Sequence, residues 1–115
     1  MAFRVTNRQV DGVAVVAPEG RIVMGDETNQ LREQVRGMLA AGNKKIVLNM
    51  ENVTYIDSAG LGMLVALHHT AKMQGASLSL CHLGSKFREV LQITKLMTVF
   101  EVDNTEADSI RSLSK

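Results

Sequence analysis

The stretch YIDSAGLGMLVAL, residues 55–67, places an acid and a serine in front of an almost continuous apolar run that contains two glycines. Before it, KKIVLNM at residues 44–50 is a short β-branched run typical of a strand, and a turn region follows. From Ser58 onward the spacing of apolar residues predicts a helix that ends near Gly75. A strand, a loop and a helix therefore follow one another, and this unit sets the fold class.

The rest of the chain repeats this alternation. Residues 3–10 and 13–17 are predicted as antiparallel strands, because the Asp11-Gly12 between them favours the positive φ angles of a tight hairpin turn. Thr105 and Asp108 have the spacing of a weak capping box at the start of a last helix. Further strands are predicted at residues 76–81 and 98–102, and further helices at residues 26–42, 85–94 and 105–113.

Strands that alternate with helices imply crossover connections and a sheet covered by helices. The predicted fold class is therefore α/β, with a mixed β-sheet of about four to five strands and helices packed mainly on one face. A chain of 115 residues is long enough for one core and too short for two independent ones. We expect one domain over residues 1–115.

The composition argues against several classes of protein. The net charge is only +1 and few aromatic side chains are available to stack on bases, so no direct nucleic-acid binding is expected. The single cysteine, Cys81, cannot form an internal disulfide, and no targeting segment is recognised, which together predict a cytoplasmic protein. The apolar run at residues 59–67 is less than half of the roughly 20 residues that cross a bilayer, so no membrane insertion is expected.

Ser58 fits two roles at the predicted start of its helix. Serine is favoured there as a cap, because its oxygen can accept a hydrogen bond from a free N–H of the first turn. The same free N–H groups and the positive end of the helix dipole also stabilise a phosphate, so an exposed serine at this place is a good phosphoacceptor.

Gly60 and Gly62 lie within the first turns of the same helix, where each glycine costs roughly 1 kcal/mol relative to alanine. Both glycines could admit the underlying sheet, or both could leave the helix start bare for a partner. Apolar residues also spread beyond the stripe of Leu61, Leu64 and Ala71, and Met63 among them is an adaptable contact residue. We expect Met63 to contribute to a partner-binding surface.

No constellation of residues looks catalytic or metal-binding. His68 and His69 are adjacent on a helix and point about 100° apart, so they cannot act as an i, i+4 metal pair. Cys81 ends a predicted strand and is expected to be a small buried apolar residue rather than a nucleophile. We therefore expect a protein that is not an enzyme and that has no metal site and no cofactor.

Three segments, VTYIDSAGLGMLV, KMQGASLSL and VLQITKLMTVFEV, together resemble the STAS-domain family, specifically its bacterial anti-sigma factor antagonists. The similarity extends over about residues 13–107. It implies a partner that is both a serine kinase and an anti-sigma factor, and a serine phosphatase that reverses the kinase's action. By the same match Ser58 is the implied phosphoacceptor and Asp57 its acidic neighbour, with Ala59, Gly60 and Gly62 as contact positions around the helix start.

The chain departs from the family pattern in one place. Members often carry an acid three residues after the glycine that follows the second strand, but Gly20 is followed here by Arg21-Ile22-Val23. The nearest acid is Asp26. If the family's acid helps to dock the kinase, Asp26 substitutes for it from a longer loop, or the choice of partner differs.

The interpretation from the sequence is a phosphorylation switch: the unmodified protein binds an anti-sigma factor kinase and releases the sigma factor, and phosphorylation of Ser58 ends that binding. The main alternative is a STAS scaffold or transport-assembly module that is never phosphorylated. A small hydrolase using Ser58, Asp57 and a histidine is a third and weaker alternative, because the sequence offers only adjacency. Monomer and weak dimer are equally open.

Overall fold

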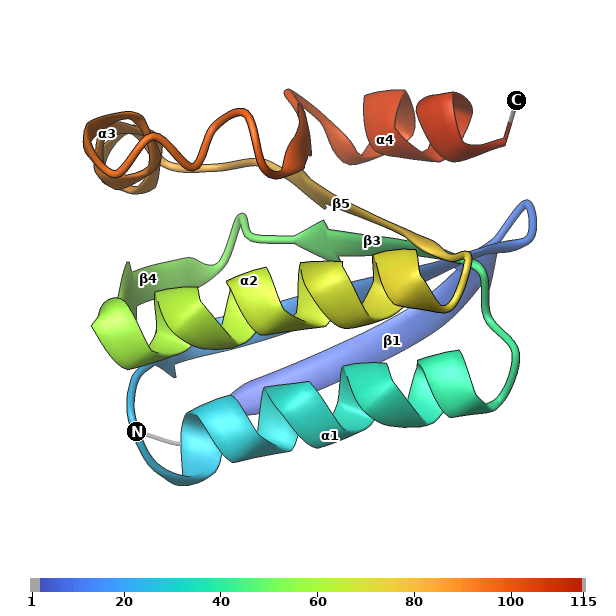
Figure 1. The fold of residues 1–115 in the computed structure, drawn as a ribbon, viewed down its shortest axis with the longest axis horizontal. Coiled ribbons are helices and arrows are strands. Elements are labelled where there is room, and N and C mark those ends of the chain that lie inside the picture. The colour runs from blue at the N-terminus through green and yellow to red at the C-terminus, as the bar shows by residue number, and fades with distance from the viewer. Residues whose placement is uncertain (1–2, 115) are drawn as a thin grey trace.

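The computed structural model describes residues 3–114 and shows an α/β fold with a mixed sheet and four helices, which confirms the predicted fold class (Figure 1). The sheet has six strands and not the predicted four to five. The strands are β1 (Arg4–Val10), β2 (Val13–Ile22), β3 (Lys45–Asn49), β4 (Val53–Ile56), β5 (Ser77–Cys81) and β6 (Glu101–Asp103). The helices are α1 (Asp26–Ala40), α2 (Ser58–Met73), α3 (Ser85–Ile93) and α4 (Glu106–Leu113).

The sheet has the strand order β1-β2-β3-β5-β6, with β4 paired to β2 alone. β1 and β2 form the predicted antiparallel hairpin, whose turn residues Asp11 and Gly12 have φ angles of 51° and 79°. The other pairs are parallel. β3 pairs with the first half of β2, and β4 pairs with its last residues, where Ile22 lies opposite Ile56.

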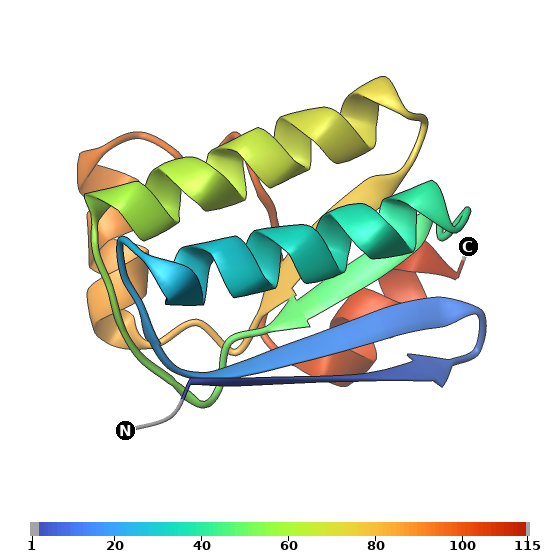
Figure 2. The same cartoon turned by 90° about the horizontal axis from the view of Figure 1, so that it is seen from below.

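The two faces of the sheet carry separate apolar clusters because side chains alternate along a strand. On β2, Ala14 and Val16 join the large core, to which α1 and α2 contribute; the two helices lie side by side over this face (Figure 2). Val13 and Val15 point the other way into a small cluster, against which Ile110 of α4 packs. The helices therefore lie mainly on one face, as predicted, with α4 on the opposite face.

Several strand boundaries differ from the prediction. β4 lies in the predicted turn region, because a strand of four residues with one partner leaves little periodic signal. β2 continues through Pro18, which lies between the residues paired with β3 and those paired with β4, so its missing N–H interrupts neither parallel ladder. β6 begins at Glu101 rather than at residue 98, because the chain turns before Phe100 enters the core.

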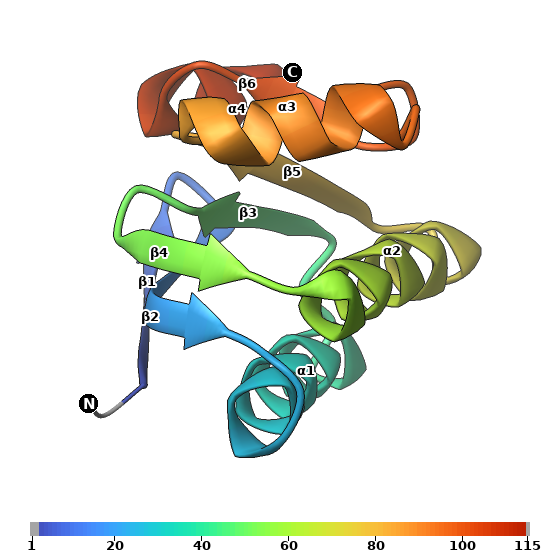
Figure 3. The ribbon, with the colours of Figure 1, turned by 90° about the vertical axis from the view of Figure 1, so that its left-hand side faces the viewer.

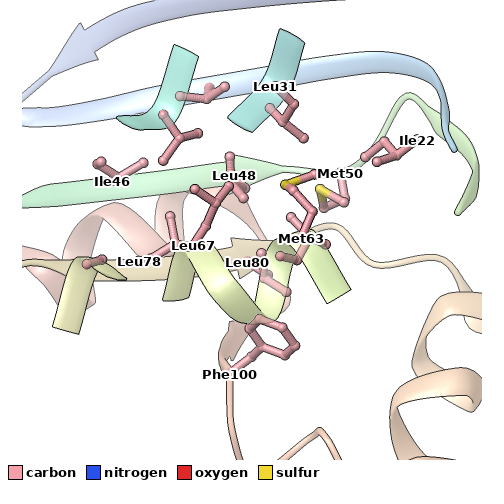
Figure 4. Packing of buried hydrophobic residues seen from close by; sticks show 14 of the residues in the cluster. Ile22, Leu31, Ile46, Leu48, Met50, Met63, Leu67, Leu78, Leu80 and Phe100 are labelled. Atoms are coloured by element: carbon pink, nitrogen blue, oxygen red, sulfur yellow. The ribbon is translucent and has the colours of Figure 1, made fainter. Parts of the chain in front are cut away.

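The large core is apolar throughout, with Leu48, Leu80 and Ile46 fully buried (Figure 4). Within residues 3–114, no helix has both the length and the apolar character needed to cross a membrane.

Candidate functional site

Asp57, and not Ser58, caps helix α2. Asp57 has extended backbone angles, and its Oδ1 atom accepts a hydrogen bond of 2.8 Å from the backbone N–H of Gly60. Ser58 is the first residue of the helix and is exposed. The prediction that Ser58 acts as the cap is therefore wrong, because the preceding carboxylate already takes the N–H group that a serine cap would bind.

The second oxygen of Asp57 binds the loop between β2 and α1. Its Oδ2 atom accepts a hydrogen bond of 2.9 Å from the backbone N–H of Met24, and the Asp57 backbone N–H donates to the carbonyl of Ile22 at 3.2 Å. The hydrogen bond from Met24, followed by that from Gly60, lowers the pKa of Asp57. Asp57 was expected to be a partner-contact residue, but its carboxylate is engaged within the chain.

Gly60 and Gly62 have different roles. A Cβ atom at Gly60 would lie 2.9 Å from side-chain atoms of both Ile22 and Ile56, and closer still to the Ile22 carbonyl oxygen. Gly60 is buried, so it serves the packing of α2 on the sheet and not a partner contact. At Gly62 a Cβ atom would meet nothing within 4 Å, and this residue is exposed. The packing explanation therefore holds for Gly60, while Gly62 leaves its turn of α2 bare.

Met63 does not lie on the surface, which corrects its expected place in a partner-binding surface. It is only 6% exposed and belongs to the large core with Met50 (Figure 4). A wider arc of α2 is buried than a sheet alone would cover, because α1 packs beside it and Phe100 closes the same core. The exposed methionine near Ser58 is Met24, at 76% exposure.

Sequence reasoning missed Met24, because it ends the apolar run Ile22-Val23-Met24, and nothing in the sequence separates the exposed member of that run from the buried one. Asp26, which was predicted as a docking acid, is exposed at the first position of α1, next to Gly25. Figure 3 shows that α1 and α2 begin at the same end of the molecule. The contact between Met24 and Asp57 therefore brings the loop before Asp26 to the start of the Ser58 helix. Ala59, in the first turn, is half-buried.

An apolar groove of about 240 Å³ borders the same end of the molecule, between β4 and α3. Tyr55, which directly follows Thr54 in β4 and is 54% exposed, is one of the lining residues. Lys86 is the only charged residue that lines it. Exposed apolar surface of this kind is typical of protein–protein contact sites.

Cys81, His68 and His69, to which the sequence assigns no chemistry, lie in surroundings that do not activate them. Cys81 is fully buried, and burial raises the pKa of its thiol to about 12, so the thiol stays neutral and unreactive at physiological pH. His69 is exposed, and His68 is half-buried with its ring edge-on to Phe100 at 5.6 Å. Burial lowers the pKa of His68. Residues 3–114 contain no group of three or more acidic, histidine or cysteine side chains placed to hold a metal ion.

The chain is similar to several known proteins. The chain is 26% identical over 103 residues to BtrV of Bordetella bronchiseptica, named as a candidate anti-sigma factor antagonist, and the match covers 90% of this chain and 88% of the relative. A candidate anti-sigma factor antagonist from Thermotoga maritima has the same fold, with a TM-score of 0.89, 22% identity, and coverage of 96% and 95% of the two chains. The phosphorylated form of the Bacillus cell fate determinant SpoIIAA matches with a TM-score of 0.72, 20% identity, and coverage of 96% and 98%.

The family model described as the STAS domain matches residues 4–109, which is nearly the whole chain. The matched range includes the residues of both parallel ladders of β2, Asp57 and the exposed Ser58. This chain belongs to the STAS domain family.

Proposed function

We propose that this protein is an anti-sigma factor antagonist whose binding to a kinase is switched off by phosphorylation of Ser58. The observation that carries the proposal is the exposed serine at the first position of α2, directly after a carboxylate that accepts two backbone N–H groups of the chain itself. The names of the curated relatives and the existence of a phosphorylated form of SpoIIAA support it. The unmodified protein binds an anti-sigma factor serine kinase, and the sigma factor is released.

The chemistry at Ser58 is a phosphoryl transfer carried out by the partner. The Ser58 Oγ atom attacks the γ-phosphorus of ATP, its proton passes to a base of the kinase, and ADP leaves. Asp57 occupies the Gly60 N–H, but the helix dipole and the other free N–H groups of the first turn still favour a phosphate. A serine phosphatase hydrolyses the phosphoester and restores the binding form.

The partner surface consists of exposed features around this serine. Gly62 leaves the second turn of α2 bare, Asp26 presents an acid from the start of α1, and the exposed part of the half-buried Ala59 lies beside Ser58. The protein then acts by binding and not as an enzyme, in the cytoplasm where sigma factors act, and it needs no cofactor of its own. It makes no direct contact with nucleic acid and does not insert into a membrane.

The proposal is tested with the anti-sigma kinase encoded beside this protein, ATP and intact-mass measurement. The unmodified protein is expected to bind the kinase, gain one phosphate at Ser58 and then lose affinity. Ser58→Ala is expected to bind and to stay unmodified. Ser85→Ala is a matched control, because Ser85 is also an exposed serine at the first position of a helix. A phosphate on Ser85 instead of Ser58, or an affinity that is unchanged by the phosphate, would contradict the switch.

A further inference from the structure

We infer that Asp57 is a positioning residue that joins the loop at residues 23–25 to the start of α2, and that this contact makes Met24 an apolar anchor of the kinase-binding surface. The inference rests on the proposed function, because it names a further part of the surface that the kinase would contact. In this inference Asp57 does not contact the kinase itself and acts by holding Met24 in place.

Three backbone contacts converge at this place. The Asp57 carboxylate accepts the N–H of Met24 at 2.9 Å and the N–H of Gly60 at 2.8 Å, one on each oxygen. The Asp57 N–H donates to the carbonyl of Ile22 at 3.2 Å, and the missing side chain of Gly60 allows α2 to approach that same carbonyl. The end of β2, the loop after it and the first turn of α2 therefore form one unit.

Met24 gains a defined position from this unit although its side chain is not buried. Its backbone N–H is bound, while the residue is 76% exposed and is followed by Gly25 with φ of 120°. A flexible apolar side chain on a fixed backbone suits a protein contact, because the side chain adapts while the loop loses little entropy on binding. We expect the Met24 side chain to insert into an apolar pocket of the kinase, the same protein that reaches Ser58.

Asp57→Asn separates the two functions of the carboxylate. Asparagine is as good a helix cap as aspartate, but its amide has one acceptor oxygen and an NH2 group that only donates. The oxygen of the asparagine can still accept the hydrogen bond from the Gly60 N–H. Its NH2 group then faces the Met24 N–H, so that two donors meet and the second hydrogen bond is lost. We expect the melting temperature to change little, amide exchange at Met24 to become about tenfold faster, and the affinity for the kinase to fall about tenfold.

A double-mutant cycle tests whether Met24 transmits this loss. Met24→Ala is expected to weaken kinase binding, and adding Asp57→Asn to it is expected to cost much less than Asp57→Asn costs alone. Met73→Ala is the control for an exposed methionine, since Met73 is 73% exposed near the opposite end of α2. Thr105→Ala is the control for a lost cap, because Thr105 caps α4 through the Asp108 N–H. Both controls are expected to bind the kinase as the unmodified protein does.

The measurements distinguish failure of this inference from failure of the proposed function. Amide exchange is measured in the free protein, so it tests the Asp57–Met24 contact without any partner. Unchanged exchange at Met24 in Asp57→Asn, full kinase affinity of that variant, or fully additive losses in the cycle would each overturn the inference. An unmodified protein that neither binds the kinase nor accepts phosphate would instead overturn the proposed function.

Discussion

The acid before Ser58 and the first of the two glycines after it are explained by contacts within the chain. Asp57 holds two backbone N–H groups, and Gly60 lies where any side chain would strike the end of β2. Ser58 and Gly62 are left exposed in the same first turns. Neighbouring residues in one motif thus divide into those that hold the fold together and those that are exposed to solvent.

The two glycines provide a direct test of this division. Gly60→Ala is expected to destabilise the fold by roughly 1–3 kcal/mol, because its Cβ would overpack against Ile22 and Ile56. Gly62→Ala is expected to stabilise it by up to about 1 kcal/mol, because alanine has the higher helix propensity and meets nothing. Urea unfolding of the two variants measures both changes. Equal destabilisation would contradict the assignment.

The bare surface at Gly62 also predicts an effect on kinase binding. Gly62→Leu is expected to weaken kinase binding more than it weakens folding, because the large side chain would stand on the bare second turn of α2. Calorimetric affinity and thermal unfolding of the same sample provide the comparison. Parallel losses in both would show that Gly62 serves the fold.

The lowered pKa of Asp57 predicts how stability depends on pH. The folded state holds the carboxylate ionised through the hydrogen bonds from Met24 and then Gly60, so the stabilisation is complete above the unfolded pKa near 3.8. It is lost as the pH falls through the lower folded pKa. We therefore expect Asp57→Ala to be clearly less stable than the unmodified protein at pH 7 and for this difference to shrink below pH 3.8. Urea unfolding at pH 7 and pH 3 checks this, and a constant difference would contradict it.

Among the elements, α4 is attached to the sheet by a different kind of contact from α1 and α2. Its Glu106 carboxylate accepts a hydrogen bond of 3.0 Å from the Asn49 side chain and also binds Arg8. Burial raises the pKa of Glu106, but these hydrogen bonds outweigh it and the pKa is lowered overall. The buried Ser109 binds Asp103 at 2.9 Å. Polar contacts therefore fix the helix over the small apolar cluster that includes Cys81.

This attachment makes Cys81 a probe of α4. Glu106→Ala is expected to loosen the helix and to increase the rate of Cys81 labelling by a thiol reagent about tenfold, because hydrogen bonds to a charged group are lost. Loss of the Glu106 charge, which after burial helps to raise the pKa of the Cys81 thiol, acts in the same direction. Arg111→Ala is the control, since its ion pair with Asp108 is exposed and contributes little. Equal labelling rates in Glu106→Ala and the unmodified protein would show that α4 is held mainly by its apolar contacts.

At the scale of the whole molecule, the candidate site lies where two parallel strands end side by side. β2 ends at Ile22 and β4 at Ile56, opposite one another, and the next residues of each strand lead to Met24 and to Ser58. Sites in α/β proteins are commonly built at the carboxyl ends of strands, where successive loops converge. α4 lies on the opposite face of the sheet from α1 and α2, away from this site (Figure 1).

Phosphorylation is therefore expected to act locally. A phosphate of about −1.5 to −2 charges on Ser58 is stabilised by the helix start in the free protein, but it meets an apolar and acidic surface in the complex. We expect a loss of roughly 2–4 kcal/mol, or about thirtyfold to a thousandfold in affinity, and only a partial effect of Ser58→Asp. Amide NMR spectra and kinase affinity of the two forms check this. Shifts spread through α4 would indicate an allosteric mechanism, and unchanged affinity would contradict the switch.

The sequence by itself determined the α/β class, the hairpin at Asp11-Gly12 and the helix from Ser58. Those features depend on local periodicity and turn chemistry, which neighbouring residues carry. The tertiary structure alone decided that Asp57 is the cap and that it binds Met24, 33 residues away in the chain. It also decided that Gly60 is packed while Gly62 is bare, and that Met63 is core while Met24 is surface. The physical reason is that each of these roles depends on which atoms of a distant segment lie opposite the residue, and only the folded chain brings those segments together.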